Sequence, residues 1–161
     1  MTDQPQPRME GKAFYALVPD AVAAIRALSG AARAHGLDEA LLELVKLRAS
    51  QLNGCAFCLQ MHTTDARRIG LSEAKLTLLP VWHEAPVFTV RERAALAWTE
   101  ALTLIAQGGV SDAAYATATA AFAPQELAYL TTAIGAINVW NRIAGAYHFT
   151  PQVPAEALVA A

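Results

Sequence analysis

The sequence is poor in several features that would point to common functions. Only 16% of its 161 residues are charged, and the formal net charge is -2. This balance provides no basic surface for nucleic acid or for an anionic membrane, so we expect neither partner. The chain also lacks a G-x-G-x-x-G sequence and a P-loop. We therefore expect no nucleotide, flavin or other cofactor.

The pattern of an export signal is missing as well. Residues 1–8 are polar and rich in proline and glutamine, and no positively charged, apolar segment follows them. Between Asp112 and Arg142 the only charged residue is Glu126, but Pro124 and several threonines and asparagines interrupt this stretch before about 20 apolar residues accumulate. We expect a cytoplasmic protein with a flexible segment at residues 1–10, in a compartment that keeps thiols mostly reduced.

Strand patterns are absent too, and what the sequence contains instead is helical periodicity. A hydrophobic content of 55% supports one packed core, so we expect a single domain over residues 1–161. Apolar spacing, cap residues and Gly or Pro stops predict an all-α fold with six to seven helices. The expected helices begin at Asp20, Asp38, Cys55, Ser72, Thr89, Ser111 and Pro124.

The helix that begins at Thr89 has the clearest start, because Thr89 and Glu92 form a capping box. It is expected to run to Gly108-Gly109 with an apolar stripe that ends at Ile105. We expect the helices at Asp38 and Cys55 to form a hairpin against it. The hairpin residues expected to be buried there are Leu44, Leu47 and Leu52.

The two cysteines of the chain lie close together, as Cys55-Ala56-Phe57-Cys58. Asn53-Gly54 ends the preceding helix, so Cys55 falls near the start of the next one. His62 follows Cys58 by one helical turn on the same face. In an antiparallel hairpin, Glu43 lies about 16 Å before the turn and His62 about 12 Å after it. This spacing predicts that a carboxylate, an imidazole and a thiol line up.

These residue types suit thiol redox chemistry. The pKa of a cysteine falls near a helix N-terminus, near a protonated histidine, or within C-x-x-C. Glu43 would fix the tautomer of His62. A disulfide across so small a loop adds only about 2 kcal/mol, so a purely structural bridge explains the pair poorly. Two plain alternatives stay open: Glu43 pairs with Lys46 on a solvated face, and His62 is a surface histidine.

Two other functional classes also stay open. Cys55, Cys58 and His62 are three zinc ligand types, with Glu43 or His83 as a fourth, although the chain has no second C-x-x-C. His83 lies in a turn region between Pro80 and Pro86, which is typical of a surface residue, and we leave it out of the catalytic set. The other class is a helical interaction protein whose cysteines only sense oxidation.

The order Glu43, Cys55, Cys58 and His62 resembles the core motif of the AhpD-like alkylhydroperoxidases in the carboxymuconolactone decarboxylase superfamily. Segments 91–100 and 137–142 are similar to that family as well, so the likeness covers most of the chain. The decarboxylases of the superfamily do not rely on such a cysteine pair. One departure concerns the strength of a peroxidase activity: the well-studied peroxidases have a histidine where this chain has Phe57.

The resemblance implies roles that the residues alone leave open. By helix position, Cys55 is the thiol with the lowered pKa. The resemblance implies instead that Cys58 attacks a hydroperoxide, that Cys55 resolves the sulfenic acid, and that His62 and Glu43 relay the proton. It also implies an unidentified thiol or dithiol reductant. The chemistry that the resemblance implies uses no metal ion.

The last expected helix, from Pro124 to Tyr147, is apolar on most of its surface. In a domain of this size, one face of such a helix is expected to meet another subunit. We therefore expect a homo-oligomer. The resemblance implies a trimer or a hexamer with the cysteine hairpin near an interface.

Overall fold

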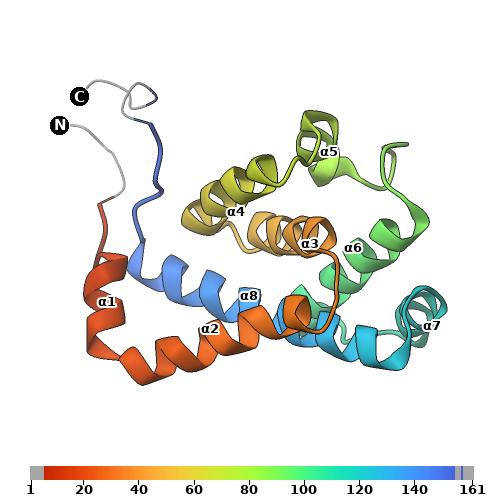
Figure 1. Ribbon diagram of the computed structural model, residues 1–161, viewed down its shortest axis with the longest axis horizontal. Coiled ribbons are helices and arrows are strands. Elements are labelled where there is room, and N and C mark those ends of the chain that lie inside the picture. Colours follow the sequence, from red (N-terminus) through yellow and green to blue (C-terminus); the bar gives the residue numbers. More distant parts are fainter. Residues whose placement is uncertain (1–5, 155–156, 158–161) are drawn as a thin grey trace.

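The computed structural model describes residues 6–154 and 157, and every regular element in that part of the chain is helical (Figure 1). The all-α prediction is confirmed. The eight α-helices within these residues are α1 (Gly11–Leu17), α2 (Pro19–Ala34), α3 (Glu39–Leu52), α4 (Ala56–Arg68), α5 (Glu73–Leu78), α6 (Val90–Thr103), α7 (Asp112–Ala121) and α8 (Pro124–Tyr147). This is one helix more than the upper end of the expected range, because residues 11–17 form α1.

Most helices start where a side chain satisfies the free N–H groups of the first turn. Asp38 caps α3 by accepting from Leu41 N at 2.9 Å. Ser72 caps α5 and Ser111 caps α7 in the same way. The capping box predicted at Thr89 is present at the start of α6. These short-range bonds fix the helix starts independently of the packing around them.

The predicted hairpin is formed by α3 and α4, which lie side by side at the centre of the molecule (Figure 1). Gly54, with a φ of 64°, makes the turn between them, and Cys55 N donates to Ser50 O at 3.0 Å across it. Leu44 and Leu47 are buried as expected. Leu52 is only half-buried, because it is the last residue of α3 at the open tip of the hairpin.

The end of α6 differs from the expectation. The helix stops at Thr103, and residues 105–107 form a separate 3-10 turn, in which Gln107 N donates to Leu104 O at 2.8 Å. Ile105 is consequently 52% exposed rather than part of the apolar stripe. The tighter winding of the 3-10 turn moves this side chain away from the buried face.

The core consists of three apolar clusters around the hairpin, α6 and α8. One apolar cluster joins α3 to α6, α7 and α8, and a second packs the other side of the hairpin against Trp82 and Phe88. A third surrounds the cysteines with Ile137, Ala144 and Phe149. The first turns of α4 are thus enclosed between α3, the middle of α8 and the segment that follows α8.

The first two helices form an arm along α8 (Figure 1). The segment at residues 1–10 was expected to be flexible. Residues 1–5 lie outside the described part, whereas Arg8 N and Met9 N donate to Tyr147 O at 2.9 and 3.2 Å. Among the described residues no single helix is long and apolar enough to cross a bilayer, and α1 with α2 reaches that length and composition only as a pair bent by 108°.

Candidate functional site

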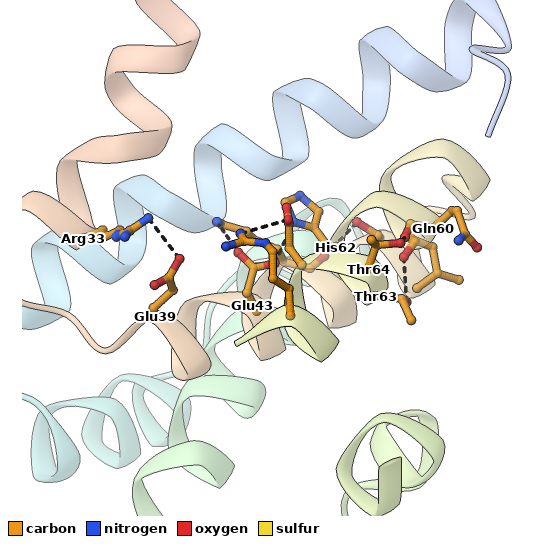
Figure 2. A network of polar contacts seen from close by, with 12 residues as sticks. Arg33, Glu39, Glu43, Gln60, His62, Thr63 and Thr64 are labelled. Carbon is orange, nitrogen blue, oxygen red and sulfur yellow. Dashed lines mark hydrogen bonds and ion pairs between the residues drawn. The ribbon is translucent and has the colours of Figure 1, made fainter. Parts of the chain in front are cut away.

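Glu43 and His62 face each other from the two helices of the hairpin. Glu43 Oε2 lies 2.8 Å from His62 Nδ1, and Figure 2 shows the two side chains pointing toward one another from α3 and α4. Their exposed fractions are 4% and 7%, so His62 is not the surface histidine that the sequence left open. An ionised carboxylate can only accept, which places a hydrogen on Nδ1; in a neutral imidazole, Nε2 is then the acceptor.

Lys46 is the second partner of this carboxylate. Its Nζ donates to Glu43 Oε1 at 2.7 Å, so Glu43 pairs with Lys46 and with His62 at the same time. Burial by itself would raise the pKa of Glu43, but the hydrogen bonds and charges of His62 and Lys46 outweigh it, and the pKa lies below its ordinary value. The carboxylate is therefore ionised at neutral pH and holds the imidazole in one orientation.

The cysteines are buried free thiols that are hydrogen-bonded to each other. Cys55 is the N-cap of α4, and its Sγ accepts from Cys58 N at 3.3 Å. The Cys58 thiol also donates to Cys55 Sγ, and this bond, against the effect of burial, lowers the pKa of Cys55 to about 7. The same contact, together with burial and the neighbouring charge, raises the pKa of Cys58. Of the two thiols, Cys55 is therefore the one that loses its proton first as the pH rises.

Asn141 of α8 also belongs to the site, although the sequence reasoning gave it no role. Its side chain hydrogen-bonds both cysteines and lowers the pKa of each. Two further bonds hold the amide in place: Nδ2 donates to Ser50 Oγ at 3.1 Å, and Oδ1 accepts from Asn53 Nδ2 at 2.9 Å. The sequence showed only that this polar residue shares a helix face with the apolar Ile137 and Ala144, and in the structure Asn141 is 3% exposed.

A cavity of about 260 Å³ opens beside α4 and the C-terminal half of α8. Its walls include Cys58 and His62 but not Cys55. The remaining walls are mostly apolar and come from several elements, and they include Tyr15, Arg26, Phe57, Ile137, Trp140 and Phe149. Phe57, where the related peroxidases have a histidine, packs edge-on against Phe149 at a centroid distance of 5.5 Å. The aromatic ring thus makes this wall apolar.

Two observations therefore single out different thiols. The lowered pKa marks Cys55 as the thiolate of the resting pair, whereas the cavity gives Cys58 access to a small molecule. These two observations are compatible if one cysteine reacts with a substrate in the cavity and the other then reacts with the oxidised first cysteine. His62 lies on the cavity side with Cys58, so the imidazole is placed to exchange a proton there.

The zinc ligand set that the sequence left open is not assembled. Within the described residues, the one group of three ligand atoms lying within 4.8 Å of one another is Glu43, His62 and Asp65, which includes neither cysteine. Lys46 occupies one oxygen of this Glu43. His83 lies elsewhere, stacked on Trp82 and 3.8 Å from Glu100 Oε2, and is exposed. It takes no part in the site.

The fold and the site define a helical protein with a buried dithiol beside a carboxylate–imidazole pair. The model of the carboxymuconolactone decarboxylase family matches residues 19–101. The chain is 34% identical to the uncharacterized protein YdfG of Bacillus subtilis (strain 168) over 130 residues. The aligned residues are 81% of this chain and 88% of that protein. This protein therefore belongs to the carboxymuconolactone decarboxylase family, as an AhpD-like member.

Other similarities agree with that assignment. The uncharacterized protein YnjA of Escherichia coli (strain K12) is 33% identical over 123 residues, which are 76% of this chain and 64% of that protein. A solved structure from Agrobacterium tumefaciens, described as a protein of unknown function and a candidate antioxidant defence protein AhpD, has a TM-score of 0.86 at 42% identity. The match covers 92% of this chain and 100% of that one. A peroxidase-related protein from Ralstonia eutropha JMP134 shares the fold at 19% identity, with a TM-score of 0.74.

Proposed function

We propose that this protein is a thiol-dependent peroxidase that reduces organic hydroperoxides through the Cys55/Cys58 pair. One observation carries the proposal: the cavity reaches Cys58 and His62, and His62 is bound to the buried carboxylate of Glu43. A thiol on the wall of a cavity that also contains a base with a fixed orientation is an arrangement that suits peroxide reduction. The AhpD-like family membership adds support.

The first step consumes the peroxide. Cys58 Sγ attacks the outer oxygen of the hydroperoxide, the S–O bond forms, and the O–O bond breaks. His62 Nε2 takes the thiol proton and passes it to the departing alkoxide, which leaves as the alcohol. Cys58 is oxidised to a sulfenic acid, and the hydroperoxide is reduced by two electrons.

The second step depends on the lowered pKa of Cys55. The Cys55 thiolate attacks the sulfur of the sulfenic acid, the S–S bond forms, and hydroxide leaves and is protonated to water. An external thiol or dithiol then returns the disulfide to the dithiol state by exchange, supplying two electrons. A reducing compartment such as the cytoplasm would provide such a donor.

The two roles are tested by trapping the sulfenic acid with dimedone. Cys55→Ser should accumulate a trapped sulfenic acid at Cys58 when peroxide is added, because the resolving thiol is gone. Cys58→Ser should give almost none at Cys55, which does not line the cavity. Trapping at Cys55 alone would reverse the roles. No trapping in either variant, together with bound zinc in the purified protein, would replace the peroxidase by the metal-binding alternative.

The same trapping reaction, followed in time on the Cys55→Ser background, tests the proton relay. Glu43→Gln or His62→Ala should slow sulfenic acid formation on the order of a hundredfold, as for a lost general base. His83→Ala serves as the control, because His83 is exposed and outside the site. An unchanged rate in both relay variants would leave Glu43 and His62 with structural roles only.

A further inference from the structure

The cavity contains one charged group that the proposed chemistry does not use. Arg26, from α2, lines the cavity, and its guanidinium lies over the Tyr15 ring at 5.3 Å from the ring centroid. Within the described part of the chain, Arg26 forms no ion pair, whereas Lys46, the other cation of the cavity, is paired with Glu43. Asp65 stands outside the cavity walls and is paired with Arg68. Arg26 therefore leaves an uncompensated positive charge at the edge of the cavity.

The walls between Arg26 and the thiol are aromatic. The rings of Tyr15 and Trp140 meet edge-on at a centroid distance of 6.1 Å, and Tyr15 and Phe149 do so at 6.0 Å. Burial raises the pKa of Tyr15, and the Arg26 guanidinium lowers it, so this cation acts on the phenol that it covers. The cavity thus has a cation at one place, a thiol at another, and apolar side chains between them.

We propose that the cavity binds amphipathic carboxylates, with the carboxylate on Arg26 and an alkyl or aryl chain along Tyr15, Trp140 and Phe149. A guanidinium and a carboxylate match in geometry as well as in charge. On the proposed function, the favoured substrate is an organic hydroperoxide that carries such a carboxylate, with its peroxide group at Cys58. A volume of about 260 Å³ lies near the lower end of the range of ligand sites, which suits short and medium chains.

Binding can be tested without any turnover. Isothermal titration of the reduced wild-type protein should show octanoate binding about tenfold more tightly than 1-octanol, and Arg26→Gln should remove this difference. Arg33→Gln is the matched control, because Arg33 is exposed on the same helix, pairs with Glu39 and does not line the cavity. Equal affinities for octanoate and octanol in the wild type, or equal losses in both arginine variants, would overturn the anion site.

Turnover then tests the substrate class. With a medium-chain hydroperoxide that bears a carboxylate, Arg26→Gln should raise KM about tenfold and leave kcat unchanged, while the methyl ester of the same hydroperoxide should show no change. Equal KM values for acid and ester in the wild type would overturn the carboxylate preference. Absence of turnover with both, while octanoate still binds selectively, would overturn the peroxidase proposal and support the anion site alone.

Discussion

Cys55 combines two tasks at the scale of a single residue. Its sulfur accepts the N–H of Cys58 as a helix cap and also accepts the Cys58 thiol, while Asn141 reaches it from α8. Each of these donors favours the thiolate over the thiol, and together they outweigh the burial that opposes it. The Phe57 N–H also lowers this pKa, so the effect arises from four donors on two helices.

The pH dependence of the thiolate follows from these donors. Because the pKa of Cys55 is lowered to about 7, its thiolate should appear as the pH rises through 7, well below the value of about 8.5 for an unperturbed cysteine. Ultraviolet thiolate absorbance, which needs no access to the buried sulfur, measures this directly. Cys58→Ala removes one donor and should move the transition upward, whereas Cys58→Ser keeps a hydroxyl donor and should move it less. A transition above 8 in the wild type would contradict the assignment.

The candidate site was only partly predictable from the sequence. Glu43, Cys55, Cys58 and His62 are joined by helix spacing and one hairpin, so the sequence places them together. Asn141 and Arg26 enter the site only because α8 and α2 pack beside α4, and such contacts between distant segments leave no spacing signal. The pairing of Glu43 with both Lys46 and His62 is likewise set by burial, which the sequence does not specify.

At the scale of the helix, starts were predicted better than ends. Caps at Asp38, Ser72 and Thr89 depend on residues three apart, so the local sequence determines them. The end of α6 depends on where its apolar face stops making contacts. The sequence placed this end at Gly108-Gly109, whereas the helix already ends at Thr103. The sequence did not predict α1, because this helix has no capping side chain and no buried residue.

The cap on α4 provides a test at this scale. Cys55→Ala removes the side-chain acceptor for Cys58 N, whereas Cys55→Ser keeps one, so the alanine variant should be less stable by about 1 kcal/mol. Chemical denaturation of the two reduced variants measures the difference. Thr89→Ala and Thr89→Ser at the capping box of α6 provide a reference pair. Equal stability of the two Cys55 variants would show that the sulfur contributes no cap.

At the scale of the whole molecule, we propose that the protein is a homo-oligomer. The arm of α1 and α2 buries little against its own chain: of the residues of α2, only Val22 and Ala32 are buried. Leu17 and Leu28 are 68% and 41% exposed on the same arm. Although α2 packs along α8, these apolar side chains stay exposed, and exposed apolar side chains on a helix are a feature of subunit contacts.

Sedimentation at micromolar concentration should therefore give a multiple of 17.1 kDa, such as a trimer or a hexamer. Leu17→Glu combined with Leu28→Glu should reduce the mass toward that of one chain, because two charges would be placed in the contact. Val90→Glu is the control, since Val90 is 84% exposed at the start of α6 rather than on the arm. A monomeric mass for the wild type would refute the oligomer.

On the proposed peroxidase function, the cap at Cys55 also affects how readily the oxidised pair is reduced again. The donors that hold its negative charge interact strongly with the dithiol form and weakly with a neutral disulfide, so ring closure gives up part of their free energy. A couple whose reduced state is favoured in this way has a higher reduction potential. The start of α4 would thus make the disulfide form easier to reduce, and thiols that are only weak reductants would be sufficient electron donors for it.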